Sequence, residues 1–367
     1  MAVSKQALLD AVRSVEVPGL SGSLLDQRML AELDVTPAGV RAVLVSPNGY
    51  AHGAELATAV RERLASVAKG AAVEVVWKPD VASRNIAEDD PVPGAKNIVL
   101  VMSGKGGVGK STVATNLALA LGRMGNRVGL LDADIYGPSI PTMFGIEGRP
   151  TTDGTKIAPL QRFGVKLMSI GFLLDDPHSA VVWRGPMLHS ALLQFLKDVD
   201  WGELDFLLLD LPPGTGDVAL TLSQRVRSTG AVIVTTPQEV ALQDVYKSVS
   251  MANKVGIPIL GIVENESYFV CDGCSKKHEI FGSGGGAKVA AMAHAPLLGQ
   301  VPLDPAVRQA GDNGTPVVQA APGSPTAQAF VAIAEQLFTR INQVAPEGAA
   351  LQIDRSGGQN RHLPITR

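Results

Sequence analysis

The sequence predicts an α/β protein built on a doubly wound, mostly parallel sheet that a small αββαβ domain precedes. Two observations lead to this prediction. From about residue 97, short apolar runs of strand length alternate with helical patterns, and one strand–helix junction is a glycine-rich loop. Continuous apolar runs suit strands that are buried on both faces of a parallel sheet, and intervening helices suit its crossover connections.

The first 78 residues predict a compact two-layer domain. Its expected elements are a helix containing Leu8 and Val12, strands near 29–35 and 40–45, a helix near 55–67 and a strand near 73–77. Residues 79–96 follow with three prolines, four acidic residues and almost nothing to bury. This composition is typical of a linker between domains.

Residues 97–345 predict the large domain. Seven apolar runs are its expected strands: 98–102, 128–131, 165–170, 206–209, 231–234, 259–263 and 297–301. Helical patterns separate them, such as 111–124, where the apolar residues share one face. The polar, periodless stretch 346–367 predicts a flexible tail.

The composition excludes several classes of protein. Hydrophobic residues make up 46% of the 367 residues, which excludes general disorder, and a net charge of −3 gives no basic field for nucleic acid. No uncharged apolar run is long enough to span a membrane, and charged residues interrupt the first 17 residues where a signal peptide needs an apolar stretch. We therefore expect a cytoplasmic protein without nucleic-acid or membrane partners.

The glycine-rich loop carries the strongest motif. It fits G-x-x-x-x-G-K-[ST] and directly follows an apolar strand; its residues are Gly104, Lys105, Gly106, Gly107, Val108, Gly109, Lys110, Ser111 and Thr112. Glycines let backbone N–H groups converge on phosphate oxygens, and the following helix adds the positive end of its dipole. Lys110 would contact the β- and γ-phosphates, and the Ser111 hydroxyl would ligate Mg²⁺. The motif predicts a P-loop NTPase domain.

A second interpretation of the same glycines is the dinucleotide motif G-x-G-x-x-G. Gly104, Gly106 and Gly109 fit it, and Asp132 lies near the place of a ribose-binding acid. That motif does not require the Lys-Ser pair that follows here, so the nucleoside triphosphate interpretation explains more of the sequence.

Two acidic residues follow apolar strands, where an open α/β sheet binds its ligands. Asp134 follows the second strand of the large domain, and Asp210 ends the fourth. A carboxylate at the end of an apolar strand is the usual support for Mg²⁺ in P-loop enzymes. Turn or helix capping is the alternative role for each. Asp217 is a weaker candidate, since it could simply begin the next helix.

Cys271 and Cys274 are the chain's two cysteines and form a CxxC pair. Iron–sulfur clusters and structural zinc usually take four ligands, and a symmetric homodimer would supply four thiolates. A bridged iron–sulfur cluster, a bridged zinc ion and a thioredoxin-like redox pair are the alternatives; redox pairs normally open a helix. His278 could add a third ligand, or remain a solvated side chain beside Lys276 and Lys277.

The loop GKGGVGKS, with its extra lysine at Lys105, resembles the deviant P-loop of the MinD, ParA and nitrogenase iron protein group. Four further segments narrow the resemblance: DADIYGPSIP, FLLLDLPPGTGD, VTTPQEVAL and VENESYFVCDGC. Together they resemble the Mrp/ApbC iron–sulfur cluster carriers over residues 96–345. Residues 1–78 resemble, more loosely, a small domain found in iron–sulfur assembly proteins.

The resemblance implies a slow ATPase that carries a [4Fe–4S] cluster to apo iron–sulfur proteins, in contact with cluster scaffold proteins. It implies that Lys105 acts on the partner subunit's nucleotide, Asp134 positions the attacking water, Asp210 supports Mg²⁺ and Asn265 recognises adenine. Cys271 and Cys274 would each hold part of a cluster shared between two subunits. The chain departs from the family pattern at Glu266 and Ser275, next to these sites.

A positioning ATPase like MinD or ParA, with a structural zinc at the CxxC, is the alternative from a different class. Such a protein needs a basic amphipathic helix for membrane or a basic patch for DNA. The last helical pattern has an apolar face but offers only Arg340 as a base, which favours a helix packed on the core. A metabolic P-loop kinase would leave Lys105 and the CxxC unexplained.

Overall fold

A computed structural model provides the structure of the chain. It describes residues 4–344 except 20, 28, 37–38, 47–51, 69, 80, 135–136, 174–184, 215–221, 223–224 and 272. The predicted tail at 346–367 and the candidate acid Asp217 lie outside the described residues.

The N-terminal part folds around a three-stranded sheet with its own core. Its elements are α1 (Lys5–Arg13), β1 (Leu30–Thr36), β2 (Gly39–Ser46), α2 (Gly53–Val67) and β3 (Val73–Pro79). The strand order is β1-β2-β3, antiparallel between the first two and parallel between the last two. Leu8 and Val12 of α1 pack in one apolar cluster with Leu56 and Leu64 of α2. The observed element order is the predicted αββαβ.

The large domain is built on an eight-stranded sheet of order β15-β12-β11-β4-β10-β5-β9-β8. Its strands are β4 (Ile98–Ser103), β5 (Val128–Asp132), β8 (Leu160–Arg162), β9 (Val165–Ser169), β10 (Phe206–Asp210), β11 (Gly230–Thr235), β12 (Ile259–Glu264) and β15 (Leu297–Gln300). All seven predicted strands are present and pair in parallel. The short edge strand β8 was not predicted, because three residues that form one antiparallel pairing leave no clear apolar period.

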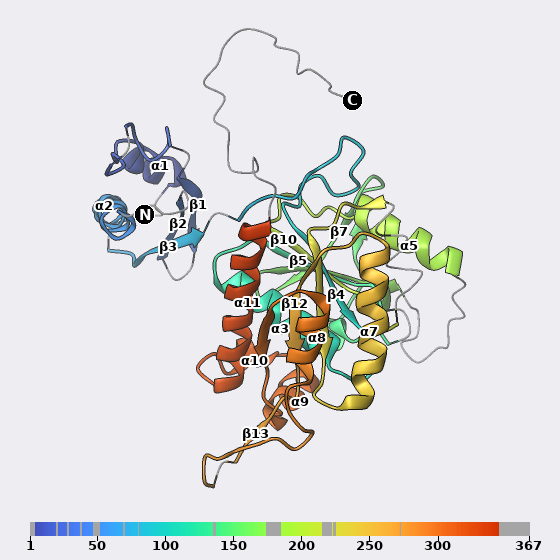
Figure 1. The fold of residues 1–367 in the computed structure, drawn as a ribbon. Coiled ribbons are helices and arrows are strands. Elements are labelled where there is room, and N and C mark those ends of the chain that lie inside the picture. The colour runs from blue at the N-terminus through green and yellow to red at the C-terminus, as the bar shows by residue number, and fades with distance from the viewer. Residues whose placement is uncertain are drawn as a thin grey trace, which may run out of the picture.

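Helices cover both faces of this sheet, so the predicted doubly wound class is confirmed. Helix α3 (Lys110–Arg123) packs against α11 (Pro325–Val344), and α7 (Glu239–Lys254) packs against α8 (Gly285–Ala293) on the opposite face (Figure 1). The other helices are α4 (Ile140–Phe144), η1 (Ile170–Leu173), α5 (Gly185–Asp198), α9 (Pro305–Asp312) and α10 (Val317–Ala320). Two small hairpins complete the described structure: β6 (Thr151–Thr152) with β7 (Ile157–Ala158), and β13 (Phe269–Val270) with β14 (Lys277–His278). Among the described helices, none combines the length and the apolar character that crossing a bilayer requires.

The segment 79–96 differs from the expected linker. Val81, Val92 and Ala95 are buried in the core of the large domain. Arg84 forms a buried ion pair with Asp90 and donates hydrogen bonds to the carbonyl oxygens of residues 92, 95 and 227. The prediction of a segment with almost nothing to bury was therefore wrong. Scattered apolar residues and one arginine, without periodicity, attach it to the large domain.

The strand order concentrates the candidate residues at one edge of the sheet. Strand β4 lies between β11 and β10. The strand that follows β4 in the chain, β5, lies on the β10 side of it, whereas the later strand β11 lies on its other side. Asp210 pairs in register with Val101 and with Asp132. Since parallel strands end at the same edge, the phosphate loop and the strand-end acids lie together at the point where the strand order reverses.

Candidate functional site

The phosphate loop connects β4 to α3 and needs glycine at two positions for identifiable reasons. A Cβ on Gly104 would lie 2.3 Å from the backbone of Asp244 and Val245 in α7. Gly109, the residue before α3, has φ of 77°, and a Cβ there would lie 2.2 Å from Nδ2 of Asn265. The Ser103 hydroxyl also donates to the Lys105 carbonyl oxygen at 3.0 Å. The loop is thus held from both sides, with its amides at the start of a 14-residue helix.

Lys110 lies between two of the predicted acids. Its Nζ is 2.5 Å from Oδ1 of Asp210 and 3.7 Å from Oδ2 of Asp134. It also donates to the Ser111 hydroxyl at 3.3 Å. The side chain of Asp210 is fully buried and that of Lys110 is 6% exposed. Burial raises the pKa of Asp210, and the contact with Lys110 opposes that shift.

Asp132 is a further buried acid at this edge, and the sequence did not assign it a role in a P-loop site. Oδ2 accepts from the Ser169 hydroxyl at 3.0 Å and from the backbone N–H of Ile140 at 3.3 Å, while Oδ1 accepts from the backbone N–H of Asp134 at 3.2 Å. Burial, together with the neighbouring charge of Asp210, raises the pKa of Asp132 to about 8. A fully buried carboxyl with these partners positions the Asp134 loop, which removes the ribose contact that the dinucleotide interpretation required. Asp132 lies directly at the end of a buried strand, two residues before Asp134. This position is the sequence signal that could have identified its structural role.

A cleft of about 220 Å³ opens over the phosphate loop. Lys105, Lys110, Ser111 and Asp134 are among its lining residues. Lys105 is half-buried, and within the described part of the chain no ion pair holds its ammonium group. The cleft therefore gathers two lysines, a hydroxyl and a carboxylate beside the start of α3, a set that suits an anionic phosphate chain and a cation.

A larger cavity of about 650 Å³ adjoins the phosphate loop on the side of Asn265. Its lining includes Gly109 and Thr112, Asn265 and Glu266, and parts of 302–316. The Asn265 carboxamide donates to the Val108 carbonyl oxygen at 3.0 Å. Burial raises the pKa of Glu266, whose backbone has a left-handed φ of 52°. A cavity of this size next to a phosphate site has room for a nucleoside, although adenine recognition by Asn265 stays a prediction.

Glu264, a buried residue that the sequence did not single out, fixes the strand end that precedes Asn265. Oε1 accepts from the Ser267 hydroxyl at 2.5 Å and from Nε2 of Gln300 at 2.7 Å, and Oε2 accepts from the backbone N–H of Gly286 at the start of α8. These bonds join β12, β15 and α8 at one point, directly before the segment that leads to the cysteines.

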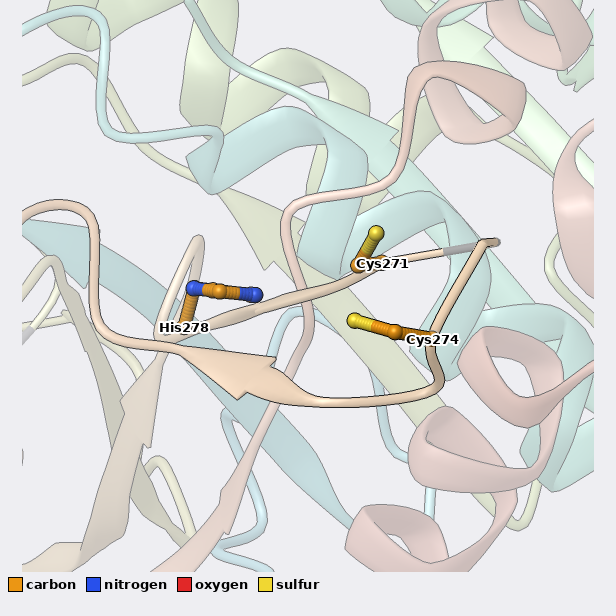
Figure 2. Close-up of side chains that lie close together, drawn as sticks. All are labelled: Cys271, Cys274 and His278. Carbon is orange, nitrogen blue, oxygen red and sulfur yellow. The ribbon is translucent and has the colours of Figure 1, made fainter.

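Cys271 and Cys274 lie in the turn between β13 and β14, in a hairpin that extends from the body of the large domain (Figure 1). The Cys271 N–H donates to the Lys276 carbonyl oxygen at 3.0 Å, and the Ser275 N–H donates to the Cys271 carbonyl oxygen at 2.7 Å. Figure 2 shows both thiols and the His278 ring on the same side of this hairpin. Their ligand atoms all lie within 4.8 Å of one another. Cys271, Gly273 and Cys274, the described residues of the CxxC, do not belong to a helix, which disfavours a thioredoxin-like pair.

The fold and the phosphate loop define a P-loop NTPase with a second lysine in its loop and a CxxC hairpin beyond its nucleotide cavity. The chain belongs to the ParA family, since its residues 94–338 match the family model described as NUBPL iron-transfer P-loop NTPase. The resemblance stated from the sequence is thereby confirmed.

Curated relatives support the same assignment. The chain is 42% identical over 351 residues to the iron-sulfur cluster carrier protein of Synechocystis, covering 94% of this chain and 99% of that protein. It is 51% identical over 270 residues to the protein of the same name in Escherichia coli, covering 72% of each chain. It is 45% identical over 273 residues to the mouse iron-sulfur cluster transfer protein NUBPL, covering 74% of this chain and 85% of that protein.

Solved structures place the fold independently. The nucleotide-binding protein of Archaeoglobus fulgidus in complex with ADP is 38% identical with a TM-score of 0.57, covering 67% of this chain and 98% of that one. The cell division ATPase MinD of Pyrococcus furiosus is 27% identical with a TM-score of 0.50, covering 66% of this chain and 98% of that one. MinD shares the fold, but α11 buries Phe330, Ile333 and Leu337 completely, as expected of a helix packed on the core. The helix that the sequence offered for a membrane contact is therefore packed on the core.

Proposed function

We propose that this protein is a slow ATPase that binds one [4Fe–4S] cluster between the CxxC hairpins of a homodimer and delivers it to apo iron–sulfur proteins, receiving it from cluster scaffold proteins. The observation that carries the proposal is the pair of thiols, Cys271 half-buried and Cys274 exposed, on a hairpin that begins shortly after Asn265 and Glu266 in the lining of the larger cavity. The names of the curated relatives support the cargo, and the P-loop supports the nucleotide.

On the nucleotide side, each residue has a part that its position supports. The backbone of 104–112 would hold the phosphates, with Lys110 turning from Asp210 to the β- and γ-oxygens when ATP enters. Asp134, at the wall of the cleft, would orient the attacking water. Lys105 would reach the nucleotide of the partner subunit, so hydrolysis would stay slow until the dimer closes.

The residues present fit a Mg²⁺ ion beside the phosphates. Oδ2 of Asp210 is buried without a hydrogen-bond partner among the described residues, although its other oxygen is paired. The Ser111 hydroxyl, in the same cleft, is the second candidate ligand. Such a cation, when bound, would neutralise charge that develops on the phosphate oxygens.

On the cluster side, ligand number favours a dimer. One hairpin offers two thiolates, whereas a [4Fe–4S] cluster usually takes four, and a two-fold axis doubles the set. The hairpin also exposes apolar side chains. Seven large hydrophobic residues stay exposed in the described part of the chain, and three of them, Val270, Ile280 and Phe281, come from the same segment of the chain as the cysteines. Exposed apolar side chains in this segment suit a surface that another protein covers.

The same thiols indicate the cellular compartment, and the domain bounds follow from the fold. Cysteines that solvent can reach serve as metal ligands only where they stay reduced, which favours the cytoplasm. We keep residues 1–78 as a separate small domain and 97–345 as the ATPase domain, with the segment before 97 attached to the latter. Residues 1–78 contain no cysteine, so any contact that they make with the cluster would not involve a thiolate.

The test is anaerobic reconstitution of the full chain with iron and sulfide, followed by absorption spectroscopy, iron and sulfide analysis and sedimentation. We expect one cluster per dimer in the wild type. Cys271→Ser and Cys274→Ser should each lose the cluster while binding nucleotide like the apo wild type. A cluster held by a monomer, or zinc retained with no cluster formed, would refute the bridged carrier.

A further inference from the structure

We propose that Cys271, Cys274 and His278 form a divalent-metal site that one protomer holds by itself, with a fourth coordination position left open. The metal class is a borderline-soft first-row cation such as Zn²⁺, Fe²⁺ or Co²⁺, because the donors are two thiolates and one imidazole. This site differs from the four-thiolate cluster site, which needs two protomers.

The hairpin register explains why the histidine joins the cysteines. Phe269 pairs with His278, and Val270 pairs with Lys277, in an antiparallel ladder. Side chains alternate between faces, so His278 shares a face with Phe269 and with Cys271, two residues further along. Cys271 and His278 are therefore diagonal neighbours across the two strands, within reach for a side chain of histidine's length.

The other face of the same hairpin removes a competing charge. Lys277 lies opposite Val270 and places its Nζ 3.5 Å from the centroid of the Tyr268 ring. Tyr268 and Val270 share a face, away from Cys271 and His278. The ammonium group of Lys277 is thus held by an aromatic ring on the far side of the ladder, whereas Lys276, whose carbonyl oxygen accepts from the Cys271 N–H, lies opposite Cys271.

The distances suit a metal with little rearrangement. The three ligand atoms lie within 4.8 Å of one another. In a tetrahedral site with ordinary metal–sulfur and metal–nitrogen bonds, ligand atoms lie roughly 3.5–3.8 Å apart, so side-chain rotation of about 1 Å closes the set. Figure 2 shows the His278 ring directed towards the two sulfurs.

His278 has no other structural task that the described residues reveal. Its side chain is exposed, and no hydrogen bond or ion pair engages its ring within the part of the chain that the structure describes. The sequence left open whether His278 is a ligand or a solvated neighbour of two lysines. The register and the ring orientation favour the ligand.

An open fourth position would let the metal bind a donor atom from another molecule. Three protein ligands and one exchangeable position characterise metal sites that accept an incoming ligand. At this site a donor atom of a protein or small molecule that contacts the hairpin would take the open position and displace a bound water. Only ligands are exchanged, so no electron donor or acceptor is required.

The site can be tested with Co²⁺ as the probe on the reduced, nucleotide-free full chain. We expect one Co²⁺ per protomer, a thiolate charge-transfer band, and two sulfurs with one imidazole nitrogen by X-ray absorption. His278→Ala should lower the Co²⁺ affinity at least about tenfold and remove the nitrogen from the spectrum. His278→Cys should raise the charge-transfer intensity by about half, because three thiolates replace two.

His294→Asn is the matched control, since His294 is also exposed but ends α8, where its φ of 50° suits asparagine. It should bind Co²⁺ like the wild type. Unchanged Co²⁺ affinity in His278→Ala, or one Co²⁺ per dimer with four sulfurs, would overturn the single-protomer site. Because His278→Ala keeps all four bridging thiolates, it should still reconstitute one cluster per dimer. Failure of the Co²⁺ site and failure of the bridged carrier are thus observed separately.

Discussion

The Asn265 carboxamide donates a hydrogen bond to the Val108 carbonyl oxygen at 3.0 Å and ties the end of β12 to the phosphate loop. Six residues after Asn265 the chain reaches Cys271. Glu264, directly before Asn265, anchors the same strand end to Ser267 and to the start of α8. A movement of the phosphate loop on nucleotide binding therefore has a short, hydrogen-bonded route to the hairpin that carries the thiols.

Lys110→Ala should abolish ATP binding and hydrolysis, because it removes the charge that we propose turns to the β- and γ-phosphates. It should also destabilise the large domain by about 3–5 kcal/mol, since it leaves the buried Asp210 carboxylate unpaired. Isothermal titration with ATP and urea unfolding measure the two effects. In the double variant Lys110→Ala/Asp210→Asn, much of the stability should return while ATP binding stays lost. Failure to recover stability would show that the ion pair is not the cause.

Lys105→Ala should keep most of the ATP affinity but lower the rate of hydrolysis, because this lysine would act across the dimer. The structure supports the separation, since Lys110 is paired with the buried Asp210, while no ion pair holds Lys105 within the described part of the chain. Steady-state ATPase assays beside equilibrium ATP binding distinguish the two lysines. A Lys105→Ala protein that turns over like the wild type would contradict a lysine acting in trans.

Asp134→Asn and Asp210→Asn should fold and bind nucleotide but lose Mg²⁺-dependent hydrolysis, by at least about a hundredfold for a lost catalytic group. The two should differ in one respect. Asp210→Asn should weaken Mg²⁺ itself, since Asp210 supplies the unpaired buried oxygen. Asp134→Asn should leave Mg²⁺ affinity nearly unchanged. Mg²⁺ titrations of the ATPase rate separate these roles, and wild-type hydrolysis by Asp134→Asn would reduce Asp134 to a turn residue.

Asp132 predicts a pH dependence of stability. Its pKa is raised to about 8 in the folded chain, against 3.8 as its ordinary value. Between these values the folded state holds a proton that the unfolded state has lost, so stability should fall as pH rises from about 4 to 8. Asp132→Asn should remove up to about 1.4 kcal/mol per pH unit of that slope. Urea unfolding of both proteins without nucleotide at pH 5.5, 6.5 and 7.5 measures it, and equal slopes would contradict a protonated Asp132.

Much of this fold could be predicted because its signals are local. Buried parallel strands are continuous apolar runs, and a strand followed by a glycine loop and Lys-Ser requires no tertiary information. The burial of 79–96 could not be predicted, because Arg84 reaches partners that the sequence places far apart, including the Arg227 carbonyl oxygen. Long-range hydrogen bonds of this kind leave no periodicity.

The candidate site was predictable to a similar degree. Strand-end position identified Asp134 and Asp210, and both lie near Lys110. The same signal was present at Asp132 and Glu264, but their roles depend on partners supplied by other strands, Ser169 and Gln300. The hairpin geometry around Cys271 depends on the register with Lys276 and His278, which two-residue strands do not reveal in sequence.

The most direct test of the central claim, that ATP and a bridged cluster act through one dimer interface, is to titrate ATP into apo and cluster-loaded protein. If both ligands shift the same dimer equilibrium, each must change the affinity of the other by the same factor. We expect the ATP affinity of the two forms to differ by about fivefold or more, a typical coupling. The cluster affinity should shift by the same factor when ATP is present. Identical ATP affinities in the two forms, with the cluster shown to be bound, would contradict the account.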